Sequence, residues 1–369
     1  MIEKDTQTDV SYIANQLQDN EDPYKVPYED FFTSTLNQYD EFDNEAWKKK
    51  TGYTCPNNPI FNNKMEGLES GLYLIAGESN SGKSAFMMNL LWDYAMHPEN
   101  NLFGIYFSLD DMADKIIPRI ISMNELIPIS VSSKPERYKE FIELGEENCS
   151  LYQDWLDKRQ QGLDKLRSLN KKFKIEDSVE RDRNGKQIKL DCGEKILDYC
   201  IKLQDYIKGE DPEANIIVGI DSLFDLNFPS QNFKAGDDKA LNDYIAKEVK
   251  RWSVEVLKVP IFGTVHLRKF DQKRRPNIAD LKESGRYAYE ANVVFIVYND
   301  VSRNGQSASI YYTEPNSIEF LPIIEIQWAK NKQSSFKGRT YYHFVPNYSK
   351  TIECNQEEMN RFDSLIYTR

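Results

Sequence analysis

One eight-residue stretch constrains this chain more than any other feature. Residues 77–84 read Gly-Glu-Ser-Asn-Ser-Gly-Lys-Ser, after the apolar run 72–76 and before the helix-forming run 85–95. This order of strand, glycine-bounded loop and helix is the context that a phosphate-binding P-loop requires, because backbone N–H groups then converge on an anion at a helix N-terminus. The sequence therefore predicts a nucleoside triphosphate site, and a chance match to the pattern is the weaker alternative.

Each part of this loop has an expected role. Lys83 should reach the β- and γ-phosphates, and the hydroxyl of Ser84 should bind Mg²⁺. The predicted nucleotide-binding residues are Gly77, Ser79, Asn80, Ser81, Gly82, Lys83 and Ser84.

Two later strands end in aspartates. Asp110 follows the run 102–108, where a carboxylate could polarise the attacking water. Asp221 follows the run 215–220, where it could hold Mg²⁺ through its water shell. Either residue alone could instead be a helix N-cap or a loop acid. Their order behind a P-loop favours catalytic and metal-binding roles.

His266 follows a further apolar strand, 260–265. Its imidazole could hydrogen-bond a γ-phosphate and report hydrolysis to the next loop, although a lone histidine is more often structural. That loop is basic, with Arg268, Lys269, Lys273, Arg274 and Arg275 within eight residues. In a chain with a net charge of -12, such a local cluster suits a site that follows the backbone of single-stranded DNA, whereas an ordinary solvated loop is the alternative.

The rest of the chain alternates strand-like and helix-like segments, which favours an α/β fold with a largely parallel sheet. The clearest helix is expected over 239–257, and Asn184-Gly185 and Asn304-Gly305 are typical of tight hairpin turns. The predicted strands are Leu72–Ala76, Leu102–Ser108, Asn215–Ile220, Pro260–Val265, Val293–Tyr298 and Ile323–Ala329.

Composition changes along the chain predict its division into segments. Residues 1–50 form an acidic arm with interspersed aromatic residues, and the turn-rich segment 51–64 reads as a linker. A core over 65–352 follows, with an insertion at about 125–210 and a tail over 353–369.

Five cysteines without a C-x-x-C pair suggest buried free thiols rather than zinc or disulfides. The polar N-terminus and the absence of a long apolar run lead us to expect a cytoplasmic protein.

These motifs together resemble the RecA-like motor domain of the DnaB-type replicative helicases, over about residues 51–352. Ser108-Leu109-Asp110 is similar to the family's Ser-Leu-Glu motif, Asp221 matches its Walker B aspartate, and His266 stands where phage primase-helicases carry a histidine. The most specific stretch is Arg275-Pro276, then Asp280-Leu281-Lys282-Glu283-Ser284-Gly285. The resemblance implies a RecA-like P-loop NTPase core whose mostly parallel central sheet is flanked by helices.

The resemblance also implies the activity and partners. We expect an ATP-dependent helicase, using ATP or another NTP with Mg²⁺, that forms a ring, by expectation a hexamer, on single-stranded DNA. Lys330 and Lys332 are expected to reach the neighbouring subunit's nucleotide, and a primase or loader could bind the arm. The DNA-binding residues that the motifs imply are Arg268, Lys269, Lys273, Arg274, Arg275, Lys282, Glu283, Gly285 and Arg286.

Three departures from the family pattern are visible. Asp110 replaces a glutamate, Lys332 occupies the arginine-finger position, and a short acidic arm replaces the helical N-terminal domain. The first two leave open a second hypothesis, a RecA-like assembly or loader protein that hydrolyses nucleotide slowly and does not unwind DNA.

Overall fold

The computed structural model describes residues 39–40, 43–44, 52–138, 145–169, 172–178, 190–234, 236–268, 274–281, 285–315 and 317–367. The chain divides into two units, Met1–Thr51 and Gly52–Arg369, and the second contains the fold described below. Almost all of the expected acidic arm lies outside the described residues, as does Asn184-Gly185.

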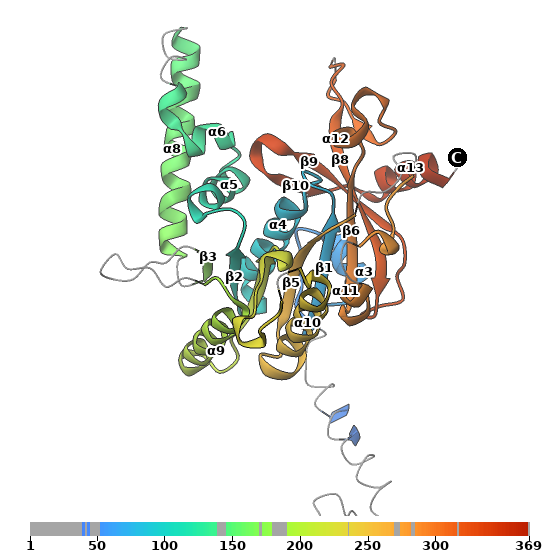
Figure 1. Ribbon diagram of the computed structural model, residues 1–369. Helices are drawn as coiled ribbons and strands as arrows, with labels where there is room; N and C mark the ends of the chain where they lie inside the picture. Colours follow the sequence, from blue (N-terminus) through green and yellow to red (C-terminus); the bar gives the residue numbers. More distant parts are fainter. Residues whose placement is uncertain are drawn as a thin grey trace, which may run out of the picture. The chain divides into compact units, whose positions relative to one another are not determined.

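The described strands of the second unit form one sheet in the order β10-β9-β8-β6-β1-β5-β4-β2-β3, with β7 paired to β8 (Figure 1). The strands are β1 Gly71–Gly77, β2 Leu102–Ser108, β3 Phe173–Asp177, β4 Asn215–Asp221, β5 Pro260–His266, β6 Val293–Asn299, β7 Tyr311–Tyr312, β8 Leu321–Asn331, β9 Arg339–Val345 and β10 Lys350–Glu353.

The sheet has a parallel part and an antiparallel part. β1 pairs in parallel with β5 and β6, and the parallel pairing continues through β4, β2 and β3. β8, β9 and β10 are added antiparallel. All six strands expected from the sequence are present, and the prediction of a mostly parallel α/β fold is confirmed.

Helices cover both faces of this sheet (Figure 1). The α-helices in the part of the chain that the structure describes are α3 Pro59–Met65, α4 Lys83–Met96, α5 Ala113–Glu125, α6 Ile129–Ser133, α8 Glu146–Ser168, α9 Gly193–Glu210, α10 Asp238–Arg251, α11 Gly285–Glu290, α12 Asp300–Asn304 and α13 Gln356–Tyr367.

Alternation along β1 explains the two cores. Leu72 and Leu74 belong to one buried cluster, which includes residues of α9 and α10. Tyr73 and Ile75 point the other way, into a cluster with residues of α3, α4 and α5. Successive side chains of a strand face opposite sides of its sheet, so a central strand needs apolar residues at every position. The P-loop therefore follows a strand that is buried throughout.

The predicted helix over 239–257 is confirmed with one change. α10 is α-helical to Arg251, and Trp252–Val256 continues as a π-helix (η5), in which the Leu257 N–H donates to the carbonyl oxygen of Trp252 at 2.9 Å. The wider turn inserts one residue into the helical repeat, which sequence periodicity does not reveal.

The hairpin turn expected at Asn304-Gly305 is wrong. Asn304 is the last residue of α12, which the side chain of Asn299 caps by accepting a hydrogen bond from the Ser302 N–H at 2.9 Å. Gly305 ends this helix with a φ of 53°. The glycine is needed for this left-handed backbone, so the Asn-Gly pair marked a helix end rather than a hairpin.

Segments expected outside the core contribute to it. The segment expected as a linker, 51–64, contains all but the last residue of α3, and its Phe61 is fully buried. Within the expected insertion, β3 extends the sheet beside β2 and α9 packs on the main core. The expected tail forms α13, where Asp363 accepts a hydrogen bond from the Tyr341 hydroxyl at 2.6 Å.

Four of the five cysteines, Cys55, Cys192, Cys200 and Cys354, are buried free thiols, as expected. Within the described residues, no helix combines the length and the apolar character that crossing a membrane requires.

Candidate nucleotide-binding and catalytic site

The P-loop connects the carboxyl end of β1 to the first turn of α4. A Cβ atom on Gly77 would lie 2.5 Å from the Ser81 Oγ and 2.9 Å from the Val297 carbonyl oxygen, so no larger residue fits there. Gly82 has a φ of 98° and Asn80 a φ of 61°, both in the left-handed region. These backbone positions form the tight loop before the helix that a phosphate-binding site requires.

Lys83 begins α4 and points back over the loop. Its Nζ donates a hydrogen bond to the Glu78 carbonyl oxygen at 2.7 Å, and only 7% of the residue is exposed. Burial lowers the pKa of Lys83 to about 8, against the opposing attraction of Asp221 and Glu78. A phosphate placed here would stabilise the charged form of this lysine. Ser84 follows it, half-buried.

Asp221 ends β4 beside this lysine, and neighbouring strands fix its carboxylate. Oδ2 accepts a hydrogen bond from the Tyr106 hydroxyl at 2.6 Å, and Oδ1 accepts one from the Thr264 hydroxyl at 2.5 Å. Oxygen donors such as this carboxylate and the Ser84 hydroxyl are the ligands that Mg²⁺ prefers. The residues present therefore fit a Mg²⁺-nucleotide.

Two consecutive aspartates after β2 have different surroundings. Asp111 pairs with Arg119 at 3.1 Å and with Lys115 at 3.4 Å. Asp110 is exposed, and the structure assigns it no ion pair with another described residue. A general base must approach a water molecule, so this difference favours Asp110.

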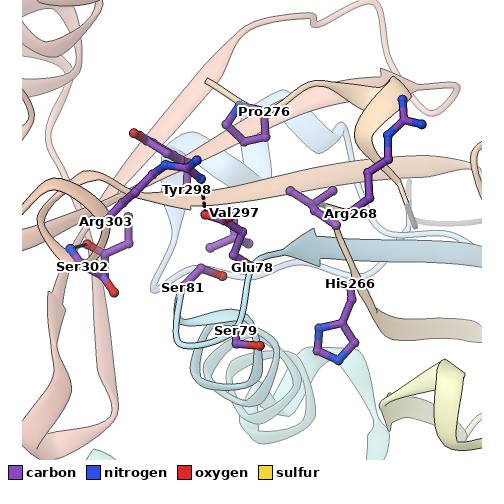
Figure 2. A pocket seen from close by; sticks show the side chains of 12 residues that line it. Glu78, Ser79, Ser81, His266, Arg268, Pro276, Val297, Tyr298, Ser302 and Arg303 are labelled. Atoms are coloured by element: carbon purple, nitrogen blue, oxygen red, sulfur yellow. Dashed lines mark hydrogen bonds and ion pairs between the residues drawn. The ribbon is translucent and has the colours of Figure 1, made fainter. Parts of the chain in front are cut away.

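His266 is the last residue of β5, directly opposite Gly77 of β1 in the parallel pairing. Its ring stacks on Phe224, with centroids 5.8 Å apart. Together with Glu78 and Ser79 it lines a cavity of about 700 Å³ beside the P-loop (Figure 2). The histidine thus lies where the nucleotide site meets the basic loop that follows.

Arg303 of α12 lines the same cavity and was not anticipated from the sequence. Its guanidinium forms an ion pair with the carboxylate of Glu78 in the P-loop (Figure 2). This pair joins the segment after β6 to the loop after β1. Arg303 follows no recognisable motif, so no sequence signal pointed to it.

The basic loop after His266 is closed at its base. Leu267 and Leu281 form an isolated β-bridge, and the Arg268 N–H donates to the Asp280 carbonyl oxygen at 2.8 Å. Arg274 donates two hydrogen bonds of 2.6 Å to the buried carboxylate of Asp280. This contact lowers the pKa of Asp280. The side chain of Arg268 remains 61% exposed.

Arg275 takes part in an internal network. Its Nε donates to Glu325 Oε2 at 2.8 Å, and Arg339 donates to the other oxygen of Glu325 at 2.7 Å. Arg275 also lies 3.7 Å from Asp300 and over the ring of Tyr298. The guanidinium of Arg275 is therefore already in contact with charged and aromatic side chains of its own chain.

The remaining expected DNA contacts are only partly described. Gly285 begins α11, and Arg286 pairs with Glu290 at 2.6 Å. Lys269, Lys273, Lys282 and Glu283 lie outside the described residues. The structure thus places Arg268 directly after Leu267 at the loop base, and Gly285 and Arg286 at the start of α11.

Lys330 and Lys332 lie far from the P-loop of their own chain. Lys330 opposes Val294 near the amino end of β6, whereas the P-loop follows the carboxyl end of the neighbouring β1. Lys330 Nζ donates to the carbonyl oxygens of Ala288 at 2.6 Å and Tyr289 at 2.8 Å, at the end of α11. The structure therefore separates these two lysines from the residues around Lys83.

Three potential metal ligands also converge outside this site. Side-chain ligand atoms of His343, Cys354 and Glu358 all lie within 4.8 Å of one another. The carboxylate of Glu358 is already occupied, because it contacts His343 at 2.9 Å and accepts a hydrogen bond from the Asn355 N–H at 2.9 Å. This arrangement acts as the N-terminal cap of α13.

Sequence reasoning missed the two residues that hold Asp221. Tyr106 and Thr264 are polar side chains inside otherwise apolar strands, and this unusual placement was the available signal. A buried hydroxyl needs a hydrogen-bond partner, and the carboxylate at the end of the intervening strand provides it.

The chain is similar in sequence to curated replicative helicases. The replicative DNA helicase DnaB of Buchnera aphidicola is 24% identical over 299 residues, covering 79% of this chain and 55% of the relative. A probable replicative DNA helicase of Trieres chinensis is 23% identical over 293 residues, covering 77% and 53%. The chain thus spans about half the length of the curated relatives it matches. No family model matches the sequence.

Two solved structures share the fold. An ATPase domain superposes with a TM-score of 0.63 at 19% identity, covering 88% of this chain and 98% of that domain. A DnaB-like replicative helicase, studied with its primase interactions, superposes with a TM-score of 0.62 at 19% identity, covering 94% and 71%. The chain is therefore similar in sequence to DnaB-type replicative helicases and carries the RecA-like fold of their ATPase domains.

Proposed function

We propose that this chain is the motor of a replicative DNA helicase, which hydrolyses ATP or another NTP with Mg²⁺ and moves along single-stranded DNA as a ring. The observation that carries the proposal is Lys83, buried at the start of α4 within the electrostatic influence of Asp221. A cation for the transferring phosphoryl group and a carboxylate for the metal are the two groups that a P-loop NTPase needs together.

The chain's own residues divide the chemistry among them. The loop 77–82 and Lys83 bind and orient the phosphates, and Asp110 orients the attacking water. Ser84 and Asp221 would hold Mg²⁺, which would neutralise charge on the phosphate oxygens. His266 connects the γ-phosphate to the loop that starts at Leu267. Lys330 and Lys332 complete the site of the adjacent subunit.

Several further parts of the proposal rest on the sequence. These are the six-subunit ring, the cytoplasmic location, a primase or loader bound through residues 1–50, and the segment boundaries given above. They stay predictions for particle imaging and binding experiments with the full chain.

The decisive test is Lys83→Ala. It should abolish NTP hydrolysis, because it removes the side-chain cation that the P-loop offers to the developing charge. A thermal unfolding measurement should show that the variant folds, and Lys64→Ala, which changes a lysine away from the P-loop, serves as the matched control. Hydrolysis at the parent rate in Lys83→Ala would overturn the site assignment.

A slow assembly or loader protein is the second candidate. It is favoured by Asp110, one methylene shorter than the family's glutamate, and by Lys332 at the finger position. Single-stranded DNA should raise the hydrolysis rate of a motor several-fold. A slow rate that does not respond to DNA would favour the assembly protein.

A further inference from the structure

Three lysines converge at the end of the sheet opposite the P-loop. Lys330 is the second-last residue of β8, Lys332 directly follows this strand, and Lys250 lies in the last turn of α10. Asn292 holds two of them: its Oδ1 accepts a hydrogen bond from Lys250 Nζ at 2.5 Å, and its carbonyl oxygen accepts one from the Lys332 N–H at 3.0 Å. Residues from two distant parts of the sequence thus share one anchor.

The ammonium groups act on one another. Burial, together with the charges of Lys332 and Lys250, lowers the pKa of Lys330 to about 8. Burial and the charge of Lys332 also lower the pKa of Lys250. Among the described residues, Glu290 is the carboxylate that counteracts both shifts, and it is already paired with Arg286 at 2.6 Å. The cluster therefore carries an excess of positive charge.

Like charges held together oppose folding, and a bound anion removes this cost. The nucleotide of the same chain cannot be that anion. Asn292, which anchors the cluster, donates its N–H to the Leu72 carbonyl oxygen, five residues before Gly77, a distance of roughly 16 Å along β1 at about 3.3 Å per residue. Lys330 is level with Leu74, three residues before Gly77, and its Nζ donates to the carbonyl oxygens of Ala288 and Tyr289 instead. The anion must come from another molecule.

We propose that Lys250 is a third catalytic residue of the site between subunits, where it binds the γ-phosphate of the neighbouring copy's nucleotide together with Lys330 and Lys332. This inference deepens the proposed function and rests on it. In the reaction, a water oxygen forms a bond to the γ-phosphorus and the bond to the β,γ-bridging oxygen breaks. The water proton passes towards Asp110, and the three lysines stay protonated while they neutralise the oxygens.

The local structure of α10 supports this role. The π-helix begins two residues after Lys250, and such inserted turns are frequent at functional sites. Lys250 is half-buried and hydrogen-bonded to Asn292, so its ammonium group is already oriented. Lys332 is exposed. A partner's phosphate could therefore approach the cluster from solvent.

The test compares Lys250→Gln with Lys247→Gln, which removes an exposed lysine from the same helix. In assembled protein, Lys250→Gln should lower turnover about 100-fold, and Lys247→Gln should not. Lys250→Arg should keep most of the activity. Mixing Lys250→Gln with Lys83→Ala should restore hydrolysis in part, because some interfaces then join an intact P-loop to an intact Lys250.

Binding gives a second readout. The affinity for a fluorescent, non-hydrolysable ATP analogue should be unchanged in dilute, dissociated Lys250→Gln and several-fold weaker in the assembled ring. Mass photometry reports assembly, and the unfolding temperature reports folding. Weaker binding in both states would mean that the substitution acts within its own subunit, and would overturn the proposal.

Other outcomes separate this inference from the proposed function. Full activity in Lys250→Gln, together with a large loss in Lys332→Ala, would overturn the role of Lys250 alone. Lost activity without rescue in demonstrated mixed rings would reduce Lys250 to an anchor for Asn292. Weaker binding of single-stranded DNA without nucleotide would assign the cluster to DNA phosphates instead. A parent protein without NTP turnover would overturn the proposed function itself.

Discussion

Arg274 and Arg275 face buried carboxylates, whereas Lys250, Lys330 and Lys332 crowd around one another. Asp280 and Glu325, the partners of the two arginines, have side chains only 2% and 3% exposed. Lys330 and Lys250 share Glu290, which Arg286 also binds. One group of basic residues is thus balanced within the chain and the other is not.

This difference predicts which basic residues stabilise the fold and which act on a partner. A buried carboxylate that loses its cation is left uncompensated, so the arginine side chains are held in place by the fold. Lysines crowded together gain stability when an anion arrives. We therefore expect substitutions of the balanced group to change folding, and substitutions of the unbalanced group to change chemistry between subunits.

The largest expected effect is that of Lys332→Ala. It should lower turnover about 1,000-fold if this lysine acts in the place of an arginine finger, with nucleotide binding and ring formation unchanged. Steady-state NTPase assays of the variant alone and mixed with Lys83→Ala provide the measurement. Full activity, or no rescue within co-assembled rings, would show that the crowded lysines do not act in chemistry between subunits.

Arg275→Ala tests the expectation that arginines paired with buried carboxylates stabilise the fold. It should lower the free energy of unfolding by about 3 to 5 kcal/mol, because Glu325 and Asp300 would remain buried with less compensation. Urea unfolding measures this change, and Lys332→Ala is the matched control, since an exposed lysine should cost little. A loss below about 1 kcal/mol would show that Arg275 is not held by its partners.

The same distinction applies to the two aspartates after β2. Asp110→Asn should lower turnover about 100-fold with nucleotide affinity nearly unchanged, because a general base acts mainly in the transition state. Asp111→Asn should have a small effect, because Arg119 and Lys115 already bind its carboxylate. A larger effect of Asp111→Asn on turnover would place the base one residue later.

The fold was largely predictable from local patterns. Apolar runs and the glycine-bounded loop identified five strands of the parallel part, the antiparallel β8 and the start of α4. β3, β9 and β10 were missed because their sequences mix buried and partly exposed positions. β7 was missed because it has two residues. Strands at or next to the edge of a sheet depend on pairing with a neighbour more than on their own sequence.

The sequence pointed to candidate site residues only where they belong to a short motif or directly follow a predicted strand. Motif spacing pointed to the P-loop, to Asp110 and to Asp221, all at the carboxyl ends of strands. Pairs such as Glu78 with Arg303, and Tyr106 with Asp221, join residues far apart in sequence. A basic run likewise does not reveal which of its members meet carboxylates, because those partners come from other elements.

The smallest expected effect concerns DNA binding by the basic loop, and it should differ between two adjacent residues. Lys273→Ala should lower the salt dependence of single-strand binding by about 0.7 on a log-log plot, the change for one lost phosphate contact. Arg274→Ala should leave this slope unchanged, because its guanidinium binds Asp280. Fluorescence anisotropy over a salt series measures both slopes, and unfolding temperatures control for loss of the loop base. Equal losses would mean that Arg274 exchanges Asp280 for a DNA phosphate. A balanced charge would then be available to a partner after all, and balance within the chain would not distinguish structural from functional residues.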